Sequence, residues 1–267
     1  LKDAASAAIY GARAAFGVIL ITTKQGKKDS APKFNYNNNI SFSKPLELPQ
    51  KANPLESVLA YKEMSWPNDT YVDGKNITQW EGYIRDYQSN PGKYPNGYIF
   101  DENGNLFLMK ERNMFDDMTD NFGFMQNHSM SVSGGSEKTV YRIGVGYTGE
   151  DGILITDKDS YDRLNLSTFM GVDVNSWLTT QLDLKYGNSK QKKVEAGGRN
   201  TVWVAAMNLP SYQNNEDYEE NGTVYPAESP ATYIRYGDPR RIKRNDLRAL
   251  GRIILSPLKG LKITGEY

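Results

Sequence analysis

The sequence has no cysteine and a single histidine, His128, in 267 residues. Without cysteine the chain can form no disulfide, no thiolate metal site and no cysteine nucleophile. One histidine is too few for a histidine-rich metal site, so we expect no metal and no cofactor. Because His128 stands beside Asn127 and Ser129 at the start of a predicted strand, we interpret it as a hydrogen-bonded structural residue.

Long apolar runs and an excess of one charge are also missing. No stretch approaches the roughly 18 consecutive apolar residues of a membrane-spanning helix, although a β-barrel would hide its apolar surface in alternate residues. The chain carries 32 Lys and Arg against 32 Asp and Glu, with no basic stripe, which argues against a nucleic-acid partner. It starts without methionine and without the features of a secretory signal, so we expect that its start is processed or truncated.

The motifs of common enzyme classes are absent as well. The sequence contains no G-x-S-x-G elbow, no phosphate-binding Walker loop and no H-E-x-x-H pair. Asp116 and Asp117 are adjacent and point apart on a strand or a helix. Residues 101–105 and 214–222 are rich in Asp, Glu and Asn, but they lack the ligand register of a calcium-binding loop. We favour Asn-Gly turns there and predict that the chain is not an enzyme.

What the chain does contain is alternating polarity from residue 33 onward. In residues 34–42, Phe34, Tyr36, Ile40 and Phe42 share one face, and asparagines and serines share the other. In the five clearest strands every Arg, Lys and Asp lies opposite the apolar set. We count about seven strands, of about 9 to 11 residues where they are clearest, in residues 33–43, 127–133, 139–148, 163–174, 177–188, 247–256 and 261–267.

The connections between these strands alternate between long or medium and short. This pattern is typical of an up-and-down barrel in the outer membrane, with short periplasmic turns and long extracellular loops. The alternative is a soluble sandwich, in which the apolar faces point into a core. Connections of some 60 to 80 residues are rare in such sandwiches. Burial of the apolar strand faces against a second sheet would distinguish the soluble form.

The first 33 residues have a different character. Residues 1–11 predict a helix with Leu1, Ala5, Ala8 and Ile9 on one face and Gly11 as its end. Residues 17–24 predict a buried strand, and a polar linker follows.

Residues 1–26, together with the hairpins after residue 127, resemble the SusC/RagA-type TonB-linked (TonB-dependent) outer-membrane transporters. Ser131–Gly135 match a tight turn of that family, and Tyr141, Arg163, Asn165 and Leu178 match its early barrel. In the plug motif of the family the matching residues are Lys2, Asp3, Tyr10, Gly11, Arg13, Gly17, Thr22, Thr23 and Lys24.

The resemblance implies a mainly β fold. It implies part of an antiparallel, up-and-down transmembrane β-barrel with about seven strands, open in this fragment, preceded by the C-terminal helix and strand of a plug domain. We expect the plug to end at residues 1–26, a linker at 27–32 and barrel in 33–267. The extracellular loops would then cover about 45–125 and 188–246.

The resemblance also implies TonB-dependent import of a large nutrient, an oligosaccharide or a peptide, across the bacterial outer membrane. The implied partners are TonB, acting through N-terminal parts outside this chain, a SusD-like surface lipoprotein and outer-membrane lipid. The alternative is a soluble sugar-binding β-domain without transport activity.

Aromatic residues of the long loops are the candidate contacts with substrate or lipoprotein. In the alternative interpretation they pack the loops themselves. The candidates are Trp66, Tyr71, Trp80, Tyr83, Tyr94 and Tyr98 in the first loop, and Tyr212, Tyr218 and Tyr225 in the second. In the plug we single out Arg13, whose charge must face the barrel wall or water, and a pairing of Arg13 with the wall is a separate hypothesis.

Overall fold

The computed structural model describes residues 24–64, 71–72, 74–194, 202–212, 217–225, 227 and 229–267. The helix predicted for residues 1–11 and most of the strand predicted for 17–24 lie outside the described residues.

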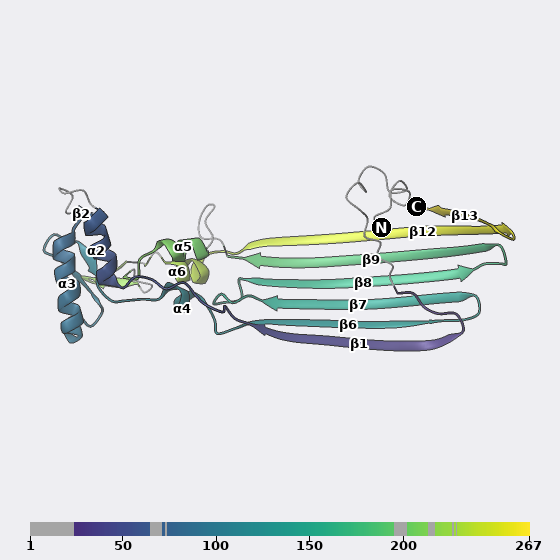
Figure 1. Cartoon of the computed structure of the whole chain (residues 1–267), viewed down its shortest axis with the longest axis horizontal. Coiled ribbons are helices and arrows are strands. Elements are labelled where there is room, and N and C mark those ends of the chain that lie inside the picture. The colour runs from purple at the N-terminus through teal and green to yellow at the C-terminus, as the bar shows by residue number, and fades with distance from the viewer. Residues whose placement is uncertain are drawn as a thin grey trace.

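Seven strands form one antiparallel sheet whose order follows the chain (Figure 1). The edge strands, first and last in that order, do not pair with each other in the described residues, so the sheet is open. This confirms the expected open sheet of about seven strands. The strands are β1 (Ser30–Ser43), β6 (Gly123–Gly135), β7 (Thr139–Asp151), β8 (Ser160–Asp173), β9 (Leu178–Lys193), β12 (Arg240–Leu258) and β13 (Leu261–Glu266).

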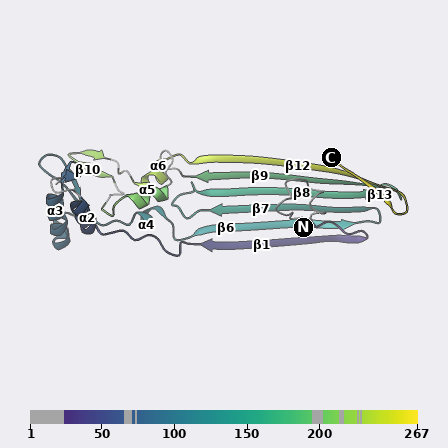
Figure 2. The ribbon, with the colours of Figure 1, turned by 45° about the horizontal axis from the view of Figure 1, so that its top comes forward.

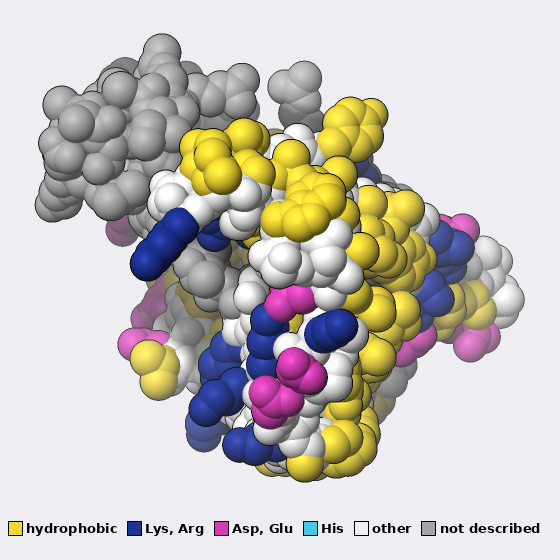
Figure 3. Space-filling view, turned by 90° about the vertical axis from the view of Figure 1, so that its right-hand side faces the viewer, with side chains coloured by type: hydrophobic (Ala, Val, Ile, Leu, Met, Phe, Trp, Pro, Cys, Tyr) yellow, Lys and Arg dark blue, Asp and Glu magenta, His cyan; other side chains and the backbone are white. Residues whose placement is uncertain are grey.

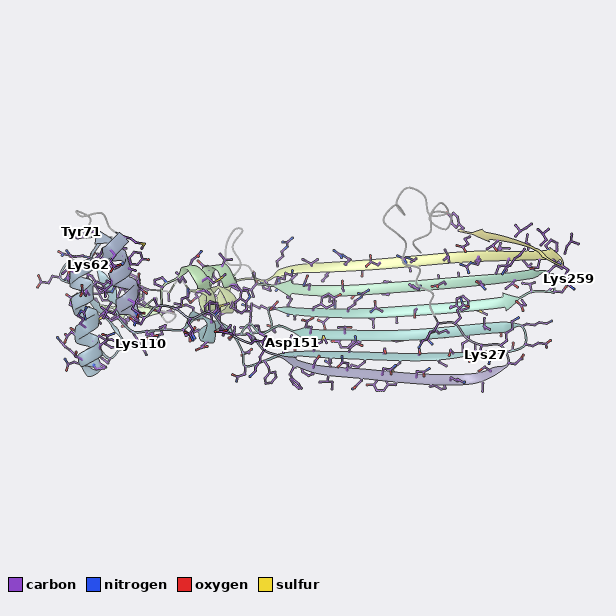
Figure 4. The ribbon with its side chains drawn as sticks, viewed as in Figure 1. Lys27, Lys62, Tyr71, Lys110, Asp151 and Lys259 are labelled. Atoms are coloured by element: carbon purple, nitrogen blue, oxygen red, sulfur yellow. The ribbon has the colours of Figure 1, made fainter. Side chains whose placement is uncertain are left out.

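Short and long connections lie at opposite ends of this sheet. Residues 136–138, 174–177 and 259–260 make the short turns, and 44–122, 152–159 and 194–239 make the longer connections. Lys27 and Lys259 lie at the short-turn end, and Asp151 lies at the other end (Figure 4).

Most strands are longer than the 9 to 11 residues that the sequence predicted. The six long strands have 13 to 19 residues. The prediction was too short because the alternation covers only the apolar part of each strand. Beyond it, polar residues such as Lys192 and Arg241 continue the backbone pairing. The connection between β9 and β12 therefore spans 194–239 rather than 188–246, and β1 begins at Ser30 rather than near Lys33.

The two longest connections fold into small helices and hairpins, which we call the cap (Figures 1 and 2). The sequence did not predict this internal structure. The first connection contains α2 (Pro54–Met64), β2 (Tyr71–Val72), β3 (Lys75–Asn76), α3 (Ile77–Ser89), the 3-10 helix η2 (Pro91–Lys93), β4 (Tyr98–Phe100), β5 (Leu106–Leu108) and α4 (Met114–Met118). The second contains α5 (Val202–Asn208), β10 (Tyr218–Glu220), β11 (Thr223–Tyr225) and α6 (Pro230–Tyr236).

The two acidic, Asn-rich stretches make turns within the described residues. Asp101 accepts hydrogen bonds from the backbone N–H groups of Asn103 and Asn105 at the tip of the β4–β5 hairpin. Asn221 and Gly222 have φ values of 50° and 79° and join β10 to β11. These left-handed conformations are typical of hairpin turns, so the turn interpretation is confirmed for both.

The hydrophobic core of the described residues lies in the cap, in two clusters. Each cluster contains residues of both long connections, so the two connections pack together in the cap. No helix of the described residues is long and apolar enough to cross a membrane. The first cluster is Val58, Ile77, Trp80, Ile84, Tyr94, Phe107, Met109 and Tyr212, and the second is Met114, Phe115, Met118, Leu154, Val202, Ala206 and Ile234.

Candidate functional site

One face of the sheet, which we call the outer face, carries large exposed apolar side chains. Phe34 and Leu247 are 81% and 77% exposed. Figure 3 shows hydrophobic side chains gathered along one side of the sheet. Because no second sheet of the described residues covers this face, the structure contradicts the soluble alternative. The outer face includes Phe34, Tyr36, Ile40, Phe42, Met130, Ile143, Val145, Tyr147, Leu164, Leu166, Met170, Leu182, Leu184, Leu247, Ile253 and Ile263.

The apolar band on the outer face runs diagonally across the strands. Cross-strand partners lead from Phe42 to Arg241 in β12. On the outer face, however, the apolar residue of β12 nearest the cap is Leu247, six residues farther from the cap than Arg241. Six residues are about 20 Å along a strand, and five strand spacings are about 24 Å, which gives an angle of about 40°. Transmembrane barrels tilt their strands by about 35–45°. The edge of the band on the cap side is formed, from β1 to β12, by Phe42, Phe124, Tyr147, Leu164, Tyr186 and Leu247.

Two tyrosines at this edge of the band direct their hydroxyl groups to polar partners. The Tyr147 hydroxyl donates a hydrogen bond to Asp162 Oδ1 at 2.8 Å, and the Tyr186 hydroxyl donates to Asn245 Oδ1 at 3.3 Å. A tyrosine with its ring in an apolar layer and its hydroxyl in a wet one is typical of a membrane boundary.

The opposite face, which we call the inner face, is polar. Arg142 Nη2 donates to Ser131 Oγ at 3.0 Å, and Arg163 Nε donates to Asn165 Oδ1 at 2.9 Å. Sequence analysis placed the strand residues of this face opposite the apolar set but did not nominate them as site residues. A depression of about 430 Å³ is lined by Lys24, Asn35, Asn37, Ser129, Met130, Ser131, Arg142, Gly144, Val145, Gly146, Asn165 and Ser167.

Residues 24–29 lie against this inner face at the short-turn end. Lys24 lines the depression, and Lys28 forms an ion pair with Asp173. The backbone N–H of Asp29 donates to the Ser136 carbonyl oxygen at 3.3 Å. A Cβ added to Gly135 would come within 2.7 Å of the Lys27 carbonyl oxygen. The chain therefore reaches β1 from the polar side of the sheet.

Three of the candidate aromatic residues lie in the cap core. Trp80 is 3% exposed and its Nε1 donates to the Leu108 carbonyl oxygen at 2.8 Å. Its ring centroid lies 4.7 Å from that of Tyr212. The hydroxyl of buried Tyr94 donates to Asp86 Oδ2 at 2.7 Å. Protein atoms cover most of the surface of Trp80, Tyr94 and Tyr212, which favours the interpretation that these residues pack the loops. Their contact with a ligand stays a prediction.

The remaining candidates are more accessible. Tyr83 is half-buried against Phe107. Tyr71 is 60% exposed, at the far end of the cap (Figure 4). Tyr98 belongs to a partly exposed aromatic cluster in which Tyr218 and Tyr225 stack with centroids 5.3 Å apart. Contact of these residues with substrate or lipoprotein stays a prediction, and Trp66 lies outside the described residues.

Most of the predicted plug motif lies outside the described residues too. Of that motif only Lys24 is described, beside the depression on the inner face. A pairing of Arg13 with the barrel wall stays a prediction. The other motif residues that are not described are Lys2, Asp3, Tyr10, Gly11, Gly17, Thr22 and Thr23.

Charged side chains hold the two long connections together. Lys51 Nζ donates to the carbonyl oxygens of Met207 and Leu209, the second at 2.8 Å, and burial lowers the pKa of Lys51. Within the first connection, hydrogen bonds from Lys93 and then Tyr94 lower the pKa of Asp86.

His128 has partners on both ring nitrogens, as the structural interpretation predicted. Its Nδ1 lies 2.8 Å from the Tyr36 hydroxyl and its Nε2 lies 3.2 Å from Gln126 Oε1. Within the described ranges, no group of three or more His, Cys, Asp or Glu residues could hold a metal ion.

Comparisons with known proteins place the chain in context. No family model matches it. It is 27% identical over 228 residues to "TonB-dependent receptor SusC" of Bacteroides thetaiotaomicron, covering 83% of this chain and 19% of the relative. It is 27% identical over 224 residues to "TonB-dependent receptor P26" of Formosa agariphila, again covering 83% of this chain and 19% of the relative. The chain thus spans about a fifth of the length of these curated relatives.

Solved structures share the fold. The RagAB peptide importer in its open-open state matches 100% of this chain and 30% of its own, with a TM-score of 0.69 and 22% identity. The closed-closed state matches 97% of this chain and 30% of its own, with a TM-score of 0.67 and 21% identity. The relatives are named as receptors and importers rather than enzymes.

Proposed function

We propose that the chain is part of a SusC/RagA-type TonB-dependent receptor of the bacterial outer membrane and forms one side of the wall of a nutrient importer. The similarity to TonB-dependent receptors and to the fold of the RagAB importer supports this proposal. The observation that carries this proposal is the exposed, diagonal apolar band of the outer face. A lipid-facing band must be apolar, and strand tilt sets its slope. The polar inner face then lines the lumen.

In this arrangement residues 1–26 are the end of a plug, 27–32 are a linker, and 33–267 are the first part of the barrel. Support comes from residues 24–29, which approach β1 from the inner face. The Gly144 and Gly146 positions leave that face shallow, so that a plug can lie close to the wall.

The imported nutrient is an oligosaccharide or a peptide, and TonB supplies the energy through N-terminal parts of the receptor. The accessible aromatic side chains of the cap, exposed Tyr71 and Tyr225 and half-buried Tyr98, contact the substrate or a SusD-like surface lipoprotein. Short turns at one end and a folded cap at the other support an extracellular cap.

The transport proposal is tested with a host strain from which the full-length gene has been deleted. We expect the deletion to abolish growth on at least one oligosaccharide or peptide as sole nutrient, while growth on the corresponding monomer is unchanged. A plasmid copy of the gene should restore growth. Unchanged growth and uptake across the whole panel would contradict nutrient import.

The membrane placement is tested separately by single-cysteine labelling, since this chain has no cysteine. In the full receptor in native membranes, Val145→Cys on the outer face should resist a water-soluble maleimide and react with a lipid-soluble one. Asn39→Cys on the inner face is the matched control. If water fills the lumen, it should react with the water-soluble maleimide in preference to the lipid-soluble one. Equal reaction of Val145→Cys with the water-soluble reagent would contradict the placement.

A further inference from the structure

Basic residues face one another where β9 and β12 leave the apolar band. On the outer face Lys190 is the direct cross-strand partner of Lys243, and Lys192 is the partner of Arg241. Like charges directly opposite each other destabilise an antiparallel pair. An anion that lies against these pairs would therefore stabilise the arrangement.

Nearby acids neutralise only part of this charge. Lys192 Nζ forms an ion pair with Asp157 Oδ2 at 2.6 Å. Asp162, the cross-strand partner of Lys190, adds a second negative charge, and its Oδ1 accepts the Tyr147 hydroxyl. Two acids thus lie beside four cations, which leaves the cluster with net positive charge.

The other three cations of the cluster are exposed. Within the residues that the structure describes, Lys190, Arg241 and Lys243 make no ion pair or side-chain hydrogen bond. The outer face thus presents unneutralised positive charge just beyond the apolar band.

The height of this cluster matches the headgroup layer of a bilayer. Lys190 lies four residues beyond Tyr186, which is about 13 Å along the strand and about 10 Å along the membrane normal at the tilt of about 40°. The headgroup layers lie directly outside a hydrocarbon core about 30 Å thick. Lys and Arg side chains can extend back toward such a layer along their own aliphatic stems.

We propose that Lys190, Arg241 and Lys243 form a site for the phosphate groups of a lipid in the membrane leaflet on the cap side. Phosphate oxygens accept charge-assisted hydrogen bonds from ammonium and guanidinium groups. The site lies on the lipid side of the wall, apart from the lumen. It rests on the membrane placement proposed above and not on nutrient transport.

The test uses the purified full-length receptor in detergent and native mass spectrometry. The probe is lipid A carrying two phosphates, compared with the same lipid after its phosphates are removed. We expect Lys190→Gln/Lys243→Gln to weaken binding of the phosphorylated lipid about tenfold and to leave binding of the dephosphorylated lipid unchanged. Arg241→Gln should also weaken binding of the phosphorylated lipid.

The matched control is Lys193→Gln/Arg244→Gln, which removes two charges from the same strands on the inner face. It should bind the phosphorylated lipid like wild type. Equal losses in both double variants, or no loss in Lys190→Gln/Lys243→Gln, would overturn the site. Displacement of the lipid by millimolar inorganic phosphate would overturn the assignment to a lipid. Heat-modifiable migration on gels verifies that each variant is folded, and growth on nutrients reports on transport independently.

Discussion

A Cβ added to Gly26 would lie 2.4 Å from the carbonyl oxygen of Tyr141. The same atom would lie 2.5 Å from the carbonyl oxygen of Gly134. Gly26 therefore lies directly on the backbone of the β6–β7 hairpin. Residues 24–29 can pack there only because this position has no side chain.

Gly26→Ala should release residues 24–29 from the hairpin. Overpacking of this kind costs about 1–3 kcal/mol, so we expect trypsin to cleave after Lys24, Lys27 or Lys28 about tenfold faster, because cleavage follows the population of the open form. Gly265→Ala is the control, since nothing lies within 4 Å of its Cβ position. Cleavage of Gly26→Ala at the wild-type rate would show that the contact is not formed.

Trp80→Ala should destabilise the cap by about 3–5 kcal/mol, because it removes a buried aromatic ring. Tyr71→Ala, at an exposed position, should change stability by less than about 0.5 kcal/mol. Thermal unfolding of the cap, followed by near-UV circular dichroism, measures both. If Trp80→Ala lowered substrate affinity but left the melting temperature unchanged, the packing role would be wrong.

Leu182→Arg should impair insertion into the outer membrane. Leu182 lies at the centre of the apolar part of β9, where a basic side chain facing lipid costs about 2–4 kcal/mol. Asn37→Arg is the control, because it lies on the inner face at a similar depth in β1. We expect less folded receptor in the membrane fraction for Leu182→Arg alone. Equal amounts of folded receptor in the membrane fraction for the two variants would contradict contact of the outer face with lipid.

Asp159→Asn should change the pH dependence of stability. Burial raises the pKa of Asp159, and the negative charge of Glu150 adds to this. The folded state then binds a proton more tightly than the unfolded state, in which an Asp has a pKa of about 3.9. Stability is therefore greatest below that value and falls as pH rises through the folded pKa. Asp159→Asn should raise the melting temperature at neutral pH and have little effect in acid.

Asp157→Asn supplies a control with the opposite sign. The hydrogen bond from Lys192 lowers the pKa of Asp157, so its contribution is present above the unfolded pKa and is lost as pH falls through the folded pKa. Asp157→Asn should therefore lower the melting temperature at neutral pH. A shift in the same direction for both variants would contradict these assignments.

The sequence predicted the sheet better than it predicted the cap. Period-two alternation indicates a sheet with two different faces, which is why residues such as Phe34 and Ile40 were assigned to the correct face. The predicted strands ended too early, because polar residues occupy both faces beyond the apolar band. The alternation stops there, although backbone pairing continues.

The cap depends on contacts that no local pattern reveals. Trp80 is buried because Tyr212, more than 100 residues later, packs on it. A local signal for α3 was nevertheless present. Asn76 caps the helix by accepting the Gln79 backbone N–H, and Ile77, Trp80 and Ile84 recur at helical spacing.

The diagonal band also sets the shape of the rim above the membrane. β1 ends one residue beyond Phe42, whereas β12 continues seven residues beyond Leu247, to Arg240. Those seven residues correspond to about 18 Å of height at a tilt of about 40°. The rim is thus a ramp that rises from β1 to β12. In the proposed membrane placement, the first long connection leaves the sheet at the lipid surface and the second leaves it well above that surface. The two connections that meet in the cap therefore start from different heights.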